Sequence, residues 1–392
     1  IRTEQIAETF LATPHRGKMY SYDLWKNMLE PVEQMLYEHE TYLTRCSFNS
    51  DEAKVFILNT LEQPTVNMLQ PLYKHPHQVK TIWQALPRRT DISLSHDNAM
   101  ILDVCSYSLE GLSYSNVQPL WMAQRELRSI LGFRSNHANG EMQRYIYLDP
   151  NKHSTGTTVT FRFTFTVEEN LEEDLLVAIE KADGYQVFLD GKQLNKQENF
   201  FLDHSFTCFV DTCVGAAVHT LDVRLPYKEE TEFEDIYLFG SFSVSPQRTI
   251  KKPVKTLEIG DWCTQGLKHY GGSVTYHYHL PPYTRPEENV SLLIKQFSGT
   301  LALVSINDAE PLAVLDSNID LSVGPLLSRT KENTLAIEII GSLRNLLGPF
   351  HRSAEVCSRI SWEDFRTEDA AYSAHYQTKS MGLMDEVVFS IS

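Results

Sequence analysis

The stretch Thr157-Thr-Val-Thr-Phe-Arg-Phe-Thr-Phe-Thr-Val167 decides the fold class, because apolar and polar residues alternate along it. Successive side chains of a β-strand point to opposite faces, so a period of two is typical of a strand that buries one face. The alternation recurs at Val274-Thr-Tyr-His-Tyr-His-Leu280. Both stretches predict antiparallel strands whose sheets pack one face on a core.

These two stretches open an internal repeat. Two further landmarks recur in the same order and at nearly the same offset. Residues 187–194 (VFLDGKQL) correspond to residues 304–312 (VSINDAEPL), and residues 219–225 (HTLDVRL) correspond to residues 333–339 (NTLAIEI). Three landmarks in one order indicate two copies of the same β domain.

Each copy contains a tight-turn signal between apolar strands, Asp190-Gly191 in the first and Asn307-Asp308 in the second. Several short strands separated by turns are what a two-sheet sandwich or jelly roll requires. The predicted fold is therefore mainly β, with two consecutive β-sandwich domains preceded by a mixed α/β segment. We place this segment at residues 1–150, the first sandwich at 151–250, and the second sandwich with a C-terminal extension at 251–392.

The N-terminal segment shows mixed patterns. Apolar residues in 21–40 follow helical spacing, which predicts one or two helices, whereas 41–48 and 54–58 have the composition of extended chain. Residues 119–131 carry apolar side chains on one helical face, and Gly132 follows as a helix-terminating residue. The segment is thus predicted to combine helices with a few strands.

Composition excludes some classes of partner. The formal net charge is −16, and nucleic acid binding requires a clustered basic face. No stretch reaches the roughly 18–20 apolar residues of a membrane-spanning helix. The six cysteines form no CxxC pair; Cys208 and Cys213 fit either buried free thiols or a small hairpin disulfide. Neither a metal nor a cofactor is predicted.

The second copy carries a recognisable set of short motifs. They are Gly260-Asp-Trp262, Gln265-Gly266, Gly272-Ser-Val-Thr-Tyr276, Asn345-Leu-Leu-Gly-Pro-Phe-His351 and Gly382-Leu383. Together they resemble the C-terminal galactose-binding-like sandwiches of large bacterial glycoside hydrolases of the α-L-rhamnosidase-like or family-2-like kind. The resemblance covers residues 95–392, and it implies that residues 1–90 are a remnant or edge of a catalytic region.

The resemblance implies a non-catalytic, carbohydrate-binding accessory region of an enzyme acting on plant or microbial polysaccharide. Its partners would be a saccharide and a catalytic domain of the same parent protein, in the bacterial cytoplasm or secreted. A catalytic barrel of about 250 residues does not fit before the first sandwich. Two alternatives stay open: a freestanding lectin-like protein, and a glycosidase with paired carboxyl groups at the junction of the N-terminal segment and the first sandwich.

Saccharide binding needs an aromatic platform for the apolar face of the sugar and planar polar groups for its hydroxyls. One loop supplies both, and the resemblance implies that a later segment folds beside it. The predicted sugar-binding residues are Trp262, Gln265, His269, Tyr270, Asn345 and His351. The alternative is structural: Trp262 packs as a core plug, and Asn345 caps a turn.

Overall fold

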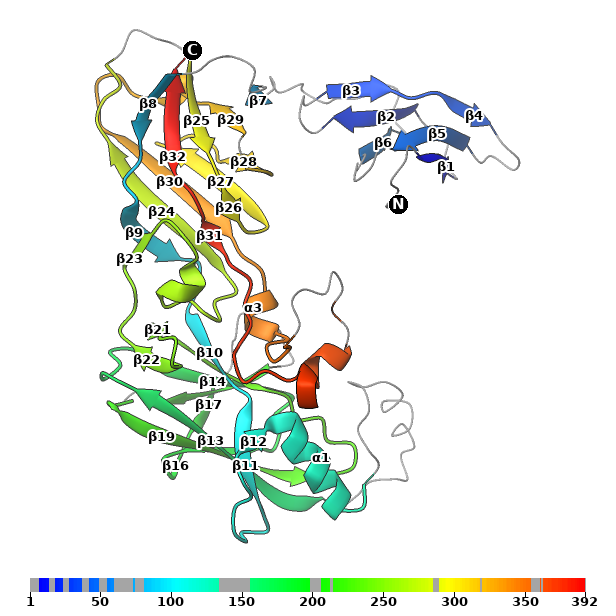
Figure 1. The fold of residues 1–392 in the computed structure, drawn as a ribbon, viewed down its shortest axis with the longest axis vertical. Helices are drawn as coiled ribbons and strands as arrows, with labels where there is room; N and C mark the ends of the chain where they lie inside the picture. The colour runs from blue at the N-terminus through cyan, green and yellow to red at the C-terminus, as the bar shows by residue number, and fades with distance from the viewer. Residues whose placement is uncertain are drawn as a thin grey trace.

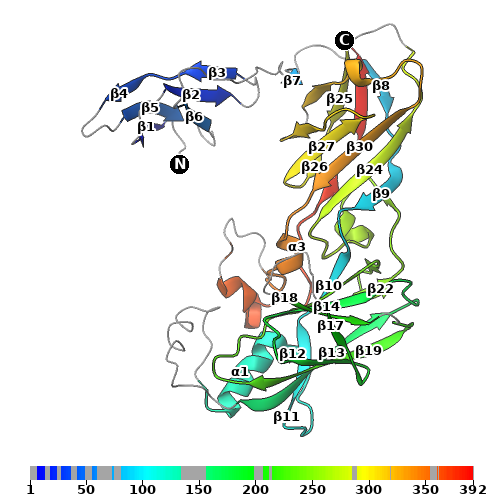
Figure 2. The same ribbon diagram turned by 180° about the vertical axis from the view of Figure 1, so that it is seen from behind.

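The computed structural model describes residues 7–13, 18–23, 28–36, 42–48, 55–59, 73–74, 81–133, 156–197, 206–211, 214–284, 289–317, 319–353, 360 and 362–391. The fold is mainly β, as the alternation predicted. Figure 1 shows two β-rich bodies stacked along the longest axis, and Figure 2 shows the same stacking from behind. We call them the first and second sandwich.

The first sandwich consists of two sheets. One sheet has the order β12 (Gln118–Pro119), β11 (Val104–Leu109), β13 (Thr157–Val167), β19 (Ala217–Tyr227), β15 (Gln186–Leu189), β16 (Lys192–Gln193). At its side, β22 (Thr249–Lys251) pairs with β13, and β21 (Ser243–Val244) pairs with β22. The other sheet has the order β10 (Asn98–Leu102), β20 (Ile236–Gly240), β14 (Leu175–Glu180), β18 (Phe206–Asp211), β17 (Asn195–Gln197). Phe161 and Phe163 of β13 lie fully buried between the sheets, together with Val177 of β14.

The second sandwich repeats this plan. Its first sheet has the order β23 (Thr256–Glu258), β9 (Arg89–Leu94), β24 (Ser273–Leu280), β30 (Asn333–Ile340), β27 (Leu301–Ile306), β28 (Leu312–Val314); its second has the order β7 (Tyr73–Lys74), β29 (Asp320–Ser322), β25 (Val290–Ile294), β32 (Val387–Ile391), β8 (Thr81–Ala85). A short pair, β26 (Phe297–Ser298) with β31 (Gly382–Leu383), and the single turns η2 (Trp262–Gln265) and η3 (Gly324–Leu326) complete it. Its core joins Val274 of β24 to Leu292 of β25.

The internal repeat is confirmed by strand order, because β13-β19-β15-β16 matches β24-β30-β27-β28. The predicted hairpin turns also match. Asp190 (φ 49°) and Asn307 (φ 51°) both adopt the left-handed conformation that a tight hairpin turn uses. Each side-chain oxygen accepts a hydrogen bond from the backbone N–H of an equivalent threonine, at 2.8 Å for Thr220 and 3.0 Å for Thr334.

Strand pairing refines the predicted domain limits. Strands β8 and β9 pair into the second sandwich, through β32 and β24, whereas β10 and β11 pair into the first, through β20 and β13. Strand β7 likewise pairs with β29 of the second sandwich, and β12 with β11 of the first, so each sandwich draws three strands from the predicted N-terminal segment. Along the sequence, the strands of the first sandwich all lie between β9 and β23 of the second.

The prediction of helices within residues 21–40 is wrong. Where this stretch is described, it forms strands: β3 (Met28–Pro31) and the end of β2 (Lys18–Asp23) pair in the order β3-β2-β6, and β4 (Gln34–Leu36) pairs with β5. Pro31 ends the edge strand β3, a position where a missing N–H costs no sheet hydrogen bond. The predicted extended stretches are confirmed as β5 (Tyr42–Phe48) and β6 (Val55–Asn59); β5 also pairs with β1 (Ala7–Thr13).

The predicted helix is confirmed as α1 (Leu120–Ile130), which buries Leu120, Ala123 and Leu127 against the first sandwich. Gly132 follows with φ 67°, the left-handed residue that commonly ends a helix. No described helix is long and apolar enough to cross a membrane.

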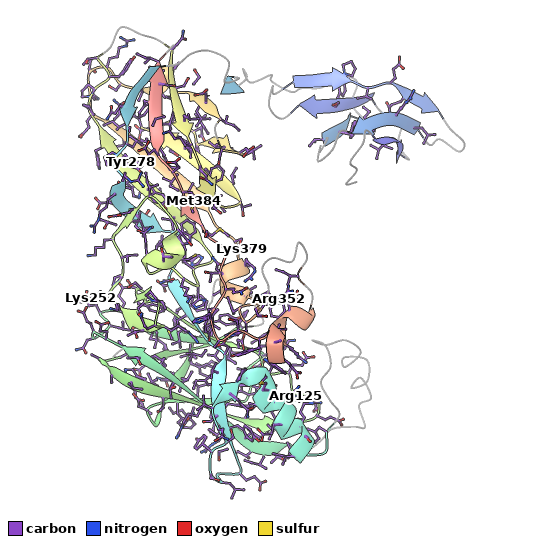
Figure 3. The ribbon with its side chains drawn as sticks, viewed as in Figure 1. Arg125, Lys252, Tyr278, Arg352, Lys379 and Met384 are labelled. Atoms are coloured by element: carbon purple, nitrogen blue, oxygen red, sulfur yellow. The ribbon has the colours of Figure 1, made fainter. Side chains whose placement is uncertain are left out.

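A C-terminal extension, residues 341–381, leaves the second sandwich after β30 and returns to it at β31. It contains α3 (Arg344–Leu347) and the single turns η4 (Trp362–Phe365) and η5 (Asp369–Ala371). Figure 3 labels Arg352 and Lys379 in this extension, at the level where the two sandwiches meet. The extension therefore runs alongside the junction of the two sandwiches.

Candidate functional site

The predicted aromatic platform is buried. Trp262 is 0% exposed and Tyr270 is 1% exposed, and both belong to the core of the second sandwich. The Trp262 ring lies against backbone: its Cζ2 atom is 3.2 Å from the position that a Cβ would take at Gly341. A sugar has no ring face to stack on here, so in this structure Trp262 acts as the core plug of the alternative interpretation.

The polar residues predicted beside the platform bind the protein's own backbone. Asn345 is fully buried; its side chain donates to the carbonyl of Lys379 at 2.7 Å and accepts from the N–H of Lys379 at 2.7 Å. The Gln265 side chain accepts from the N–H of Glu258 and donates to its carbonyl. The amide groups of both side chains thus hold two segments of the chain together, and their hydrogen bonds are made within the protein.

His269 is also fully buried, and one ring nitrogen lies 3.2 Å from the carbonyl oxygen of Asn345. Burial lowers the pKa of His269 to about 3, and the charge of Arg248 adds to this effect. The ring is therefore neutral at ordinary pH and packs edge-on against Phe350. Its position suits a core residue.

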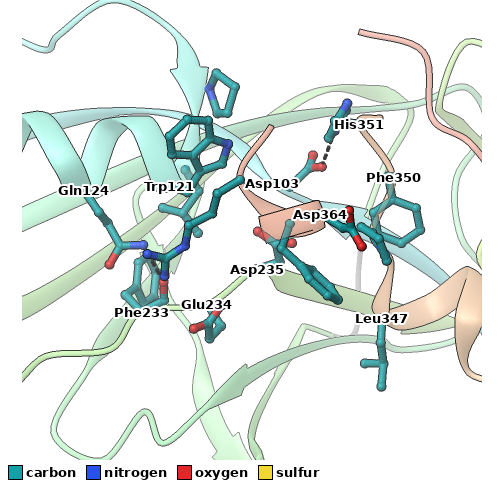
Figure 4. A pocket seen from close by; sticks show the side chains of 15 residues that line it. Asp103, Trp121, Gln124, Phe233, Glu234, Asp235, Leu347, Phe350, His351 and Asp364 are labelled. Carbon is teal, nitrogen blue, oxygen red and sulfur yellow. Dashed lines mark hydrogen bonds and ion pairs between the residues drawn. The ribbon is translucent and has the colours of Figure 1, made fainter. Parts of the chain in front are cut away.

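His351 is the predicted residue that reaches a pocket. This pocket is a cavity of about 60 Å³ between α1, the loop before β20 and the C-terminal extension. Figure 4 shows Asp103 and Asp235 in its middle, with Trp121 on one side and His351 on the other. The lining residues are Asp103, Pro119, Leu120, Trp121, Gln124, Phe233, Glu234, Asp235, Leu347, Pro349, Phe350, His351, Asp364, Phe365 and Arg366.

Asp103 joins the first sandwich to the extension. The carboxylate follows β10 and is 6% exposed. One oxygen lies 2.9 Å from His351 Nε2; the other accepts a hydrogen bond from the Tyr376 hydroxyl and lies 3.5 Å from Arg248. Burial alone would raise the pKa of Asp103, but the His351 hydrogen bond and the charge of Arg248 hold it below its usual value. Asp103 is therefore ionised, and its oxygens are occupied.

Asp235 has the opposite environment. Its side chain is half-buried at the end of the loop before β20 and makes no hydrogen bond or ion pair with any residue in the described ranges. Burial raises the pKa of Asp235 well above its usual value, and the negative charges of Asp103 and Glu234 raise it further. The pocket thus contains one ionised carboxylate, held by the protein, and one carboxyl group with a raised pKa and no partner among the described residues.

The helix contributes an aromatic ring and an amide. Trp121 and Gln124, both partly exposed, line the pocket from α1. The guanidinium of Arg125 lies 5.0 Å from the centre of the Trp121 ring, a cation–π contact on the helix surface. Gln124 donates to the carbonyl of Phe233 at 2.6 Å. An accessible indole, an amide and carboxyl groups are the types of side chain that saccharide sites use.

The sequence analysis missed Asp103, Trp121 and Asp235 as pocket residues. All three lie within the region that carries the family resemblance, but no local pattern distinguishes them from structural residues. Strand pairing brings the two aspartates together: β10 pairs with β20 through Leu102 and Ile236, which are the neighbours of Asp103 and Asp235 in sequence. Among the described residues, no group of three or more His, Cys, Asp or Glu is arranged to hold a metal ion.

Comparison with protein-family models finds no match. Comparison with curated proteins finds none either. Among solved structures, a rhamnosidase from Novosphingobium sp. PP1Y is similar at 16% identity and a TM-score of 0.26, over 61% of this chain and 23% of that chain. A GH2 β-galacturonidase from Eisenbergiella tayi is similar at 10% identity and a TM-score of 0.23, over 63% and 37%.

An anti-sigma factor domain-containing protein is similar at 10% identity and a TM-score of 0.20, over 61% of this chain and 90% of that chain. The present chain thus covers well under half the length of either glycosidase. At these TM-scores the likeness assigns neither a family nor a function, so any functional conclusion depends on the geometry of the pocket itself.

Proposed function

We propose that this chain is a non-catalytic, carbohydrate-binding accessory region of a glycoside hydrolase, and that it binds saccharide in the pocket between α1, the loop before β20 and the C-terminal extension. The observation that carries the proposal is the pocket's lining. A partly exposed indole, Trp121, stands across the cavity from polar groups that include Asp235 and His351. The sequence resemblance to glycoside hydrolase sandwiches points to the same ligand class.

The size of the cavity limits what it can hold. A volume of 60 Å³ accommodates about four or five water-sized groups. This is room for one edge of a pyranose ring, with the remainder of the sugar outside. Such partial enclosure suits a site that grips a terminal or side-chain residue of a larger saccharide.

The neighbouring carboxyl groups favour binding over hydrolysis. A glycosidase needs one carboxyl group as acid and a second one free to act as nucleophile or base. Asp235 has the environment of an acid, but the oxygens of Asp103 already face His351, Tyr376 and Arg248. A carboxylate that accepts three donors is poorly placed to attack a sugar or activate water. The glycosidase alternative therefore has only half of the required pair at this junction.

The proposal is tested by isothermal titration calorimetry of the full chain with a panel of neutral, amino and acidic oligosaccharides. Trp121→Ala is expected to abolish measurable binding while leaving the unfolding temperature nearly unchanged, because Trp121 is only partly buried. Ile130→Ala is the matched control: it truncates an apolar residue of the same helix that is 57% exposed, away from the pocket lining. Equal affinities for the unmodified chain and Trp121→Ala would refute the assignment of this pocket.

A freestanding lectin-like protein would give the same calorimetric result. The two are separated by adding the catalytic domain encoded with this chain in its parent gene. An accessory region is expected to raise that domain's activity on polymeric substrate, and Trp121→Ala to remove the gain.

A further inference from the structure

Three of the carboxylates that line the pocket already have cations beside them. Asp103 has Arg248, as described above. Asp364 lies 2.9 Å from Arg352, and the charge of Arg366 attracts Glu234. These pairs are made within the protein, so none of the three needs a ligand to balance its charge.

Asp235 is the exception. Within the described part of the chain it has neither a hydrogen-bond nor an ion-pair partner, although it faces the cavity. The attraction of Arg248 is outweighed by the negative charges of Asp103 and Glu234, which add to the effect of burial on its pKa. The net potential at Asp235 is therefore negative. A positive group placed there is attracted by Asp235 and by both neighbours.

We infer that the saccharide bound in this pocket carries a protonated amino group, and that Asp235 is the residue that binds it. This inference rests on the proposed function and narrows it from saccharides in general to amino sugars. An ammonium group supplies the missing positive charge and up to three hydrogen-bond donors. N-acetylation removes the charge, and a uronic acid replaces it with a repelled carboxylate.

The experiment is calorimetry of the full chain with three disaccharides of the same linkage, built from glucosamine, N-acetylglucosamine and glucose. The glucosamine disaccharide is expected to bind at least about tenfold more tightly than the other two, because a hydrogen bond to a charged group contributes about 1.5–3 kcal/mol.

Asp235→Asn is expected to remove this preference. Asp183→Asn is the matched control, since Asp183 is an exposed carboxylate of the same sandwich, paired with Lys196. Equal affinity for the three disaccharides, or an unchanged preference in Asp235→Asn, overturns the inference while leaving saccharide binding at Trp121 in place. Absence of binding by all three overturns the proposed function as well. The ligand comparison uses the unmodified chain, so it stands even if a variant fails to fold.

Discussion

Replacing Trp262 with alanine is the sharpest test of whether this residue is a core plug or a sugar platform. The indole is fully buried in the core of the second sandwich and lies against Gly341. Truncation of a buried tryptophan removes apolar contacts and leaves a cavity, at a cost of about 3–5 kcal/mol. For a unit of about 150 residues this corresponds to a loss of roughly 6–20 °C in unfolding temperature.

The assay is thermal unfolding followed by far-ultraviolet circular dichroism, which reports on the strands and not on the tryptophan that is removed. Trp262→Phe is the matched variant. The indole nitrogen has no hydrogen-bond partner among the described residues, so phenylalanine loses volume without losing a hydrogen bond. It is expected to cost about 1–2 kcal/mol. A Trp262→Ala chain that unfolds within about 1 °C of the unmodified chain would refute the buried placement and restore the sugar-platform interpretation.

Three further predictions concern Asp190, Arg248 and Cys105. Hydrogen bonds from Thr220 and His219 outweigh burial and lower the pKa of Asp190. Its stabilising effect is therefore present above the ordinary pKa of aspartate and is lost as pH falls through the lowered value. Asp190→Asn should weaken the fall in unfolding free energy with decreasing pH, measured by urea unfolding from pH 6 to pH 2. Arg248→Ala removes the cationic partner of the buried Asp103 carboxylate and should cost about 3 kcal/mol, with faster hydrogen exchange in the C-terminal extension. Burial raises the pKa of the Cys105 thiol, so site-resolved mass spectrometry should find this thiol unlabelled by alkylating reagents until the chain unfolds.

Local patterns predicted the strands that bury one face. The alternation at Thr157–Val167 fixed β13, and the repeated landmarks predicted the shared strand order of the two sandwiches. These features depend on neighbours in sequence, since side chains two apart share a face of a strand. Helix α1 was predictable for the corresponding reason, an apolar stripe at helical spacing followed by Gly132.

Long-range pairing escaped prediction. Strand β9 pairs with β24 across Ser93 and Thr275, so the second sandwich takes strands from either side of the first. Periodicity shows that a stretch is a strand but does not name its partner. The same limit explains the error in residues 21–40, where spacing compatible with a helix was overridden by pairing with other strands.

Most of the predicted site residues are buried, because aromatic and amide residues suit both a sugar site and a core. Trp262 and Tyr270 pack in the hydrophobic core of the second sandwich. The Asn345 side chain hydrogen-bonds both the backbone N–H and the backbone carbonyl of Lys379. His351 reached the pocket because the extension carries it to Asp103. The sequence shows which residues have side chains suited to sugar binding, and the fold determines which of those side chains are exposed and which are buried.

The most direct test of the central claim is a thermal-shift screen of the unmodified chain against neutral, amino and acidic saccharides. A ligand at ten times its Kd adds about 1.4 kcal/mol of stability, which is a few degrees at this size. The account predicts a shift with amino sugars that disappears in Trp121→Ala. No shift with any saccharide would contradict carbohydrate binding by this chain and leave the two sandwiches with a purely structural role.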